Sequence, residues 1–163
     1  MNEAITEQRA VAWAFEKMLE ENLYWAVVHD RWMDDANFNK GPRTFFRAVP
    51  APVRPLVAAM VRRQLRRTLH GQGTGRHSPE EIAALATRSI GATADFLAAK
   101  PYMMGAEPVG LDAASFAFIA GVLCPVFETP LRLAAERHDN LKSYVERMLA
   151  RFYPDRAGRE TAA

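Results

Sequence analysis

A long, uninterrupted stretch of helical periodicity near the N-terminus constrains the fold more than any other feature of this sequence. No Pro or Gly occurs from Thr6 to about Asp34, and apolar residues recur there at intervals of three and four. They form two adjacent stripes, the first made up of Val11, Ala14, Met18, Trp25, Val28 and Trp32 and the second of Ala12, Phe15, Leu19, Leu23 and Ala26. The pattern predicts one long helix that packs against neighbours on two sides.

Turn signals divide the rest of the chain into further helical segments. The segment from Asp35 to Arg54 is rich in Asn, Gly and Pro, and it is predicted to be a loop that packs down through Phe38, Phe45 and Phe46. Helices are predicted at residues 55–69, 79–99, 111–124, 131–137 and 141–152. Ser78, Pro79 and Glu81 form a capping-box helix start. No segment alternates with a period of two, so we expect an all-α bundle of about five to six helices without a sheet.

Length and composition are those of one globular domain. A chain of 163 residues buries roughly 70% of its unfolded surface. The single cysteine, Cys124, cannot form an intramolecular disulfide, and no signal peptide opens the sequence, so we expect a cytoplasmic protein. The longest stretch without charge, Ala113 to Phe127, is too short for a membrane span. We predict one helical domain at residues 3–154 and a disordered tail at 155–163.

The sequence contains no motif for self-sufficient catalysis or metal binding. Gly71, Gly73 and Gly75 resemble a phosphate loop in composition, but no strand precedes them and no Gly-Lys-Ser/Thr follows, which favours a helix stop. The four histidines include no pair spaced four apart, and no nucleophile elbow is present. We therefore assign no catalytic residue and no metal ligand.

One concentrated basic patch occurs, although the net charge of the chain is only +2. Arg62, Arg63, Arg66 and Arg67 share one predicted helix, with His70, Arg76 and His77 nearby. Arginines at this spacing commonly form a solvated helix face, and no aromatic residues are interleaved with them. We therefore expect no nucleic-acid partner.

Two polar residues fall on the apolar arc of the first predicted helix. Asn22 and His29 lie seven residues apart at the centre of that arc, and buried polar groups need partners. They either hydrogen-bond within the core or line a pocket together with Tyr24, Trp25 and Trp32. Asn22, Trp25, His29 and Trp32 are the candidate substrate-binding residues.

A turn followed by a helix in the second half of the sequence carries a family resemblance. Lys100-Pro101-Tyr102 leads to Gly105, and Asp112 follows near the start of the next helix. This arrangement resembles the C-terminal domain of glutathione S-transferases, in which a Lys-Pro-aromatic-x-x-Gly turn precedes a core helix that starts with Ser/Thr-x-x-Asp. The resemblance implies that Asp112 is a structural helix cap. Val109 stands at the Ser/Thr position without a hydroxyl, so one cap worth about 1 kcal/mol is absent.

Other segments are similar to one branch of that family, which includes metaxin and the failed-axon-connections proteins. They are Glu21–Trp25 with Asp30–Trp32, Gly71–His77, Asn140–Tyr144 with Arg147 and Met148, and Phe152–Pro154. The resemblance extends over residues 3–154.

This resemblance implies a role in glutathione conjugation that the chain cannot perform alone. In the family, a preceding thioredoxin-like domain binds glutathione and activates its thiol, and nothing in this sequence matches that domain. The chain is expected to be inactive alone, either as half of a transferase-like protein or as a stand-alone module. With a thioredoxin-like partner and glutathione as co-substrate, it would supply the acceptor-substrate wall and part of a homodimer interface. The alternative is a non-catalytic, metaxin-like protein-interaction module.

Overall fold

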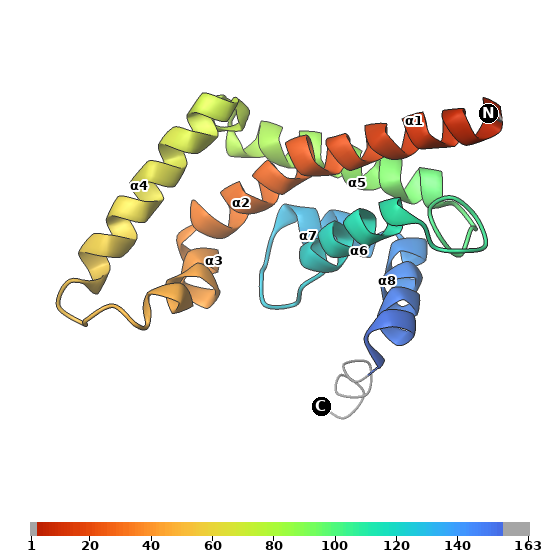
Figure 1. The fold of residues 1–163 in the computed structure, drawn as a ribbon. Coiled ribbons are helices and arrows are strands. Elements are labelled where there is room, and N and C mark those ends of the chain that lie inside the picture. Colours follow the sequence, from red (N-terminus) through yellow and green to blue (C-terminus); the bar gives the residue numbers. More distant parts are fainter. Residues whose placement is uncertain (1–2, 155–163) are drawn as a thin grey trace.

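The computed structural model describes residues 3–154, which are predominantly helical and contain no β-sheet. Figure 1 shows a helical bundle and, to its left, an arm of the chain that extends away from it. We use the term arm for residues 35–76. The prediction of an all-α fold is confirmed. The predicted tail at 155–163 lies outside the described residues.

The predicted first helix is present, but it contains an internal irregularity. It consists of α1 (Glu3–Met18), a π-helical turn (Leu19–Leu23) and α2 (Tyr24–Trp32), which follow one another without a break. Leu19, Leu23 and Ala26 are buried, so the second predicted stripe faces the core. The first stripe is only partly covered, and Asn22 is exposed. The expectation that Asn22 lies at the centre of a buried arc is therefore wrong.

The arm contains more helix than the sequence predicted. Residues expected to form a loop contain α3 (Asp35–Lys40) and a 3-10 turn (Pro42–Phe46), and α4 (Arg54–Gln72) follows. Asp34 caps α3, because its carboxylate accepts the Asn37 backbone N–H at 2.7 Å. Phe38 and Phe46 are buried as predicted, whereas Phe45 is 73% exposed, so its assignment as an anchor is wrong.

Two glycines after α4 join the arm to the bundle. Gly73 has a φ of 121°, which lies in the region that favours glycine, and it ends α4. Gly75, in the 3-10 turn Thr74–Arg76, lies against the last turn of α4: a Cβ there would come within 2.8 Å of both the His70 nitrogen and the Leu69 carbonyl carbon. These glycines therefore shape a close turn, as the helix-stop interpretation predicted.

The bundle is built around α5 (Pro79–Leu97) and α6 (Gly110–Val122). The predicted capping box at the start of α5 is confirmed, because Ser78 and Glu81 each accept the other's backbone N–H. α7 (Pro130–Glu136) and α8 (Asp139–Phe152) pack against both central helices. Ile90, Ile119 and Leu141 are fully buried at the centre. All six predicted helices form, and α3 is the addition among the described residues.

The start of α6 is organised by one buried carboxylate. Asp112 is 1% exposed, and it accepts the backbone N–H groups of Met103 and Val109, each at 2.8 Å. The Tyr144 hydroxyl, from α8, lies 3.0 Å from the same carboxylate. Burial raises the pKa of Tyr144, and the charge of Asp112 raises it further, so the hydroxyl keeps its proton for this contact. Asp112 thus connects the turn before α6, the first turn of α6, and α8.

Candidate functional site

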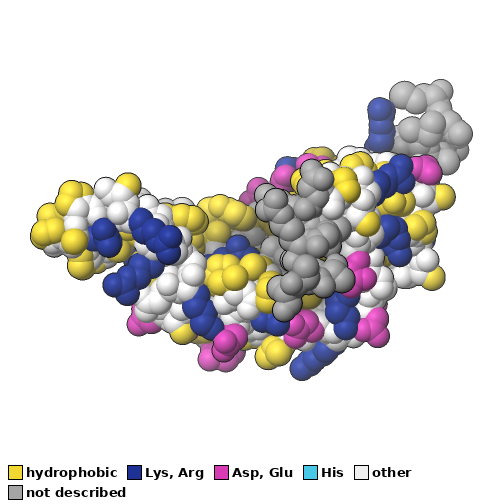
Figure 2. Space-filling model, turned by 90° about the horizontal axis from the view of Figure 1, so that it is seen from below, with side chains coloured by type: hydrophobic (Ala, Val, Ile, Leu, Met, Phe, Trp, Pro, Cys, Tyr) yellow, Lys and Arg dark blue, Asp and Glu magenta, His cyan; other side chains and the backbone are white. Residues whose placement is uncertain are grey.

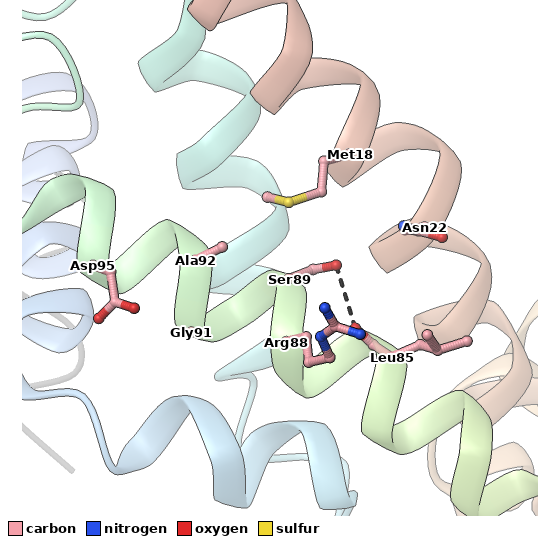
Figure 3. Close-up of a pocket in the computed structure, with 8 residues that line it drawn as sticks. All are labelled: Met18, Asn22, Leu85, Arg88, Ser89, Gly91, Ala92 and Asp95. Carbon is pink, nitrogen blue, oxygen red and sulfur yellow. Dashed lines mark hydrogen bonds between the residues drawn. The ribbon is translucent and has the colours of Figure 1, made fainter.

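A groove lies between the first helical rod and α5. It has a volume of about 610 Å³ and is lined by Met18, Asn22, Leu85, Arg88, Ser89, Gly91, Ala92 and Asp95. Figure 3 shows Met18 and Asn22 on one wall, with the α5 residues on the other. A smaller hollow of about 210 Å³ shares Asn22 and Leu85 with the groove and extends to the glycine turn after α4.

The α5 wall of the groove is open because its central residues are small. Gly91 and Ala92 stand between the longer side chains of Arg88 and Asp95 (Figure 3). A Cβ added at Gly91 would have no protein atom within 4 Å. The glycine is therefore not required for close packing with a neighbouring helix, and it leaves the surface of α5 accessible from the groove.

The π-helical turn places Asn22 on the groove. Leu19 and Leu23 are both fully buried, while Asn22 between them is exposed. A π-helical turn accommodates one residue more than a regular turn and changes the direction of the side chains on either side of it. Such turns occur frequently at functional sites. The local irregularity thus gives the groove an amide group beside the thioether of Met18.

The chemistry of the groove is suited to binding. Arg88 and Asp95 are exposed and supply one group of each charge, while Met18, Leu85 and Ala92 supply apolar surface. Its only hydroxyl, on Ser89, is buried and lies 3.4 Å from the Leu85 carbonyl oxygen (Figure 3). No histidine or cysteine lines the groove. It can therefore hold a partly apolar ligand but offers no activated nucleophile of its own.

The structure separates the four candidate substrate-binding residues. Asn22 lines the groove, whereas Trp25, His29 and Trp32 do not. The Trp25 ring is 5.1 Å from that of Tyr24, and His29 Nδ1 is 3.5 Å from the Asp30 carboxylate. Trp32 packs near Phe38 at the base of the arm, with ring centroids 6.0 Å apart. The structure therefore does not bring the four residues into one pocket.

The groove residues on α5 were missed by the sequence analysis. Leu85, Arg88, Ala92 and Asp95 follow one another at intervals of three and four, the spacing of one helix face. A glycine inside that face, at position 91, was the additional signal, because glycine is unfavourable in a helix interior. The sequence interpretation of this helix rested on its capping box and assigned none of these residues to a site.

No helix within 3–154 is long and apolar enough to cross a bilayer. Within the same range, no three His, Cys, Asp or Glu side chains gather closely enough to hold a metal ion.

Family models match two parts of the chain. The glutathione S-transferase C-terminal domain model matches residues 86–148, which run from within α5 into α8 and include Asp112. The glutathione S-transferase N-terminal domain model matches residues 2–37. The expectation that nothing in this sequence matches that N-terminal domain is therefore wrong. The matched residues that the structure describes form α1, the π-helical turn, α2 and the start of α3, and they contain no sheet.

Curated relatives match most of this chain but a smaller part of their own length. Isoprene-epoxide–glutathione S-transferase of Rhodococcus sp. (strain AD45) is 29% identical, over 87% of this chain and 60% of the relative. Failed axon connections of Drosophila melanogaster is 29% identical, over 91% of this chain and 38% of the relative. Human metaxin-1 is 27% identical, over 90% of this chain and 33% of the relative. The chain thus spans at most 60% of these three relatives. No solved structure is a significant match.

Proposed function

We propose that this chain, which resembles the C-terminal helical domain of glutathione S-transferases and of their metaxin and failed-axon-connections branch, forms the acceptor-substrate wall of a glutathione-conjugating protein. The observation that carries the proposal is the open groove between the first helical rod and α5. It combines apolar surface with one positively and one negatively charged group, and it has no activated nucleophile. A thioredoxin-like half would hold glutathione and stabilise its thiolate.

In the proposed protein, this chain binds and orients the electrophile, while the thioredoxin-like half binds glutathione. The thiolate sulfur forms a bond to the electrophilic carbon, and the electron pair of the broken bond leaves with the departing group. Met18, Leu85 and Ala92 offer an apolar surface for the acceptor, and the Arg88 guanidinium offers donors to an anionic group. Asn22 is the predicted substrate-binding residue that this arrangement favours. Roles for Trp25, His29 and Trp32 stay predictions.

The first experiment measures thiol conjugation with and without an added thioredoxin-like half. We expect no turnover of a chromogenic aryl halide by the chain alone, because no histidine or cysteine lines the groove and its one hydroxyl, on Ser89, is buried. Addition of the N-terminal half of a related transferase, as a fusion, should produce glutathione-dependent turnover. Turnover by the chain alone would contradict the assignment of the thiol-activating groups to the other half.

The second prediction uses the free space at Gly91 to fill the groove. Gly91→Leu should weaken the binding of anilinonaphthalene sulfonate, an apolar anionic dye, by about tenfold, because a Cβ at this position has free space and the leucine side chain would extend from it into the groove. The same change should raise the free energy of unfolding by about 0.5 kcal/mol, since glycine is unfavourable within a helix. Dye fluorescence and denaturant unfolding provide the two measurements.

Two controls make the groove experiment specific. Gly91→Ala removes the glycine but adds only one methyl group, so dye binding should change little. Leu56→Ser removes exposed apolar surface from the arm, away from the groove. The affinity of the groove for the dye should therefore stay the same. Equal dye affinities for the wild-type chain and Gly91→Leu would contradict a binding role for the groove.

The second candidate function is a non-catalytic protein-interaction module similar to metaxin. The observation in its favour is apolar surface outside the groove, where Trp13 on α1 and Leu133 on α7 are both exposed. The same fusion experiment separates the two candidates. An inactive fusion that forms a stable complex with another protein through these residues would support the interaction module over the enzyme.

A further inference from the structure

The arm carries a charge pattern unlike that of the rest of the chain. Residues 36–79, which include the whole arm except Asp35, contain nine Lys or Arg and no Asp or Glu. The other 119 residues contain twelve Lys or Arg and all 19 carboxylates, so the overall charge of +2 conceals a segment of +9 beside a remainder of −7. This segregation makes the arm a local source of positive potential, to which an anionic surface is complementary.

Several of these cations have no carboxylate beside them. Arg62 pairs with Asp35, and Lys40 pairs with Glu128, each at 2.7 Å. Arg63, Arg66 and Arg67 are exposed on α4, and within residues 3–154 none of them forms a salt bridge. Their charge is therefore available to an external partner.

Apolar side chains occupy the same outer side of α4. Leu56 and Met60 are 63% and 64% exposed, although residues of this type are usually buried. Leu56, Met60, Arg63 and Arg67 follow one another at intervals of four, three and four, which places them on one face of the helix. The opposite face, including buried Leu69, is directed toward the protein. The outer face is thus apolar near the start of α4 and basic farther along.

The loop that precedes α4 is apolar, and several of its polar backbone groups are satisfied internally. It reads Ala48-Val49-Pro50-Ala51-Pro52-Val53, without a charged residue. The Arg54 side chain donates to the Val49 carbonyl from two nitrogens, at 3.0 and 3.1 Å. The Pro50 carbonyl accepts the backbone N–H groups of Val53 and Arg54, each at 3.1 Å. These contacts lower the cost of bringing the loop into the headgroup region, where water and lipid polar groups serve the remaining backbone groups.

We propose that the arm docks on the surface of an anionic lipid bilayer, with the loop at 48–53, Leu56 and Met60 entering the headgroup region and Arg63 and Arg67 contacting lipid phosphates. Figure 1 shows the start of α4 at the end of the molecule far from α6 and α8, and Figure 2 shows yellow and dark-blue side chains together at that left-hand end. The arm can therefore reach a membrane without the bundle intervening.

The combination of features favours lipid over the other anionic partners. Nucleic-acid surfaces bind arginines but offer little to exposed aliphatic side chains, and single-stranded sites use aromatic stacking. An anionic bilayer interface accommodates aliphatic residues and guanidinium groups at once, because hydrocarbon lies directly beneath the phosphates. The proposed contact lies on the surface and requires no membrane-spanning segment.

The test is co-sedimentation of the full 163-residue chain with lipid vesicles. One set contains phosphatidylcholine and phosphatidylserine in equal parts, and the other contains phosphatidylcholine alone. We expect binding to the anionic vesicles only, with loss of binding at high salt. The double variants L56S/M60S and R63Q/R67Q should each bind at least about tenfold more weakly. Circular dichroism verifies that they keep the helical fold.

Matched controls lie on α7 and directly after it, outside the arm. Leu133→Ser removes a leucine that is 61% exposed, and Arg137→Gln removes an exposed arginine after α7; neither should change vesicle binding. The proposal fails if the wild-type chain does not bind anionic vesicles, or if L56S/M60S binds them as tightly as the wild type. Tighter binding to double-stranded DNA than to anionic vesicles would also overturn it.

Discussion

Replacing Asp112 by Ala is expected to lower the free energy of unfolding by about 3 kcal/mol. The carboxylate is 1% exposed and receives two backbone N–H groups, from Met103 and Val109, and the Tyr144 hydroxyl. Its removal leaves the buried Met103 N–H without an acceptor and takes the helix-start contact from the Val109 N–H. The Tyr144 hydroxyl loses the carboxylate but keeps the backbone carbonyl of residue 112, at 3.0 Å. The helix-cap contact alone, as considered from the sequence, would account for only about 1 kcal/mol.

Urea unfolding of the variant measures this loss, with Asp139→Ala as the matched control. Asp139 also lies in the first turn of a helix, but its side chain is 94% exposed and its partner Lys142 is in solvent contact. Its removal should cost far less than that of Asp112, because exposed ion pairs contribute little. Equal losses in the two variants would show that burial of Asp112 does not set its contribution.

The second large effect concerns the glycine turn between the arm and the bundle. Gly75→Ala should destabilise the protein by about 2 kcal/mol, because the new Cβ would come within 2.8 Å of backbone atoms of Leu69 and His70. Backbone atoms in the last turn of α4 cannot move aside as a flexible side chain could. The turn must therefore open or shift, which also loosens the packing of α4 on its neighbours.

Gly71→Ala is the matched control for this prediction. Gly71 belongs to the same glycine-rich segment, but it lies inside α4, and a Cβ there would have no atom within 4 Å. This substitution should raise stability by up to about 0.5 kcal/mol, since Ala is the better helix former. Thermal melts of the two variants should therefore shift in opposite directions. A parallel decrease would mean that flexibility, rather than space, is what the segment requires.

The helices of the bundle could be predicted because their signals are local. The periodicity of residues 6–34 and the capping box at Ser78 depend only on neighbours in the sequence, and both predictions are confirmed. α3 was missed because it is short, and its cap, Asp34, lies at the end of the preceding apolar pattern. The apolar pattern of the first predicted helix extends to about Asp34, so the cap of the shorter helix α3 was read as part of it.

The candidate site was harder to predict because it depends on how two helices meet. Two neighbouring stripes of the first helix are apolar, and only packing against α5 decides that Leu19 and Leu23 are buried while Met18 faces a groove. The same packing places Asn22 on the groove, whereas Trp25 and His29 lie outside it. Periodicity identifies a helix face, but it does not specify which face another helix will cover.

The π-helical turn at Leu19–Leu23 has a consequence for changes in chain length. Each residue of an α-helix advances the side-chain direction by about 100°, so one residue accommodated in a wider turn sets the angular phase between α1 and α2. Deletion of a single residue from this turn would restore a regular helix and rotate α1 relative to α2. Phe15 would leave Phe96, with which it now stacks at 4.3 Å. In this segment, the number of residues matters as much as their identity.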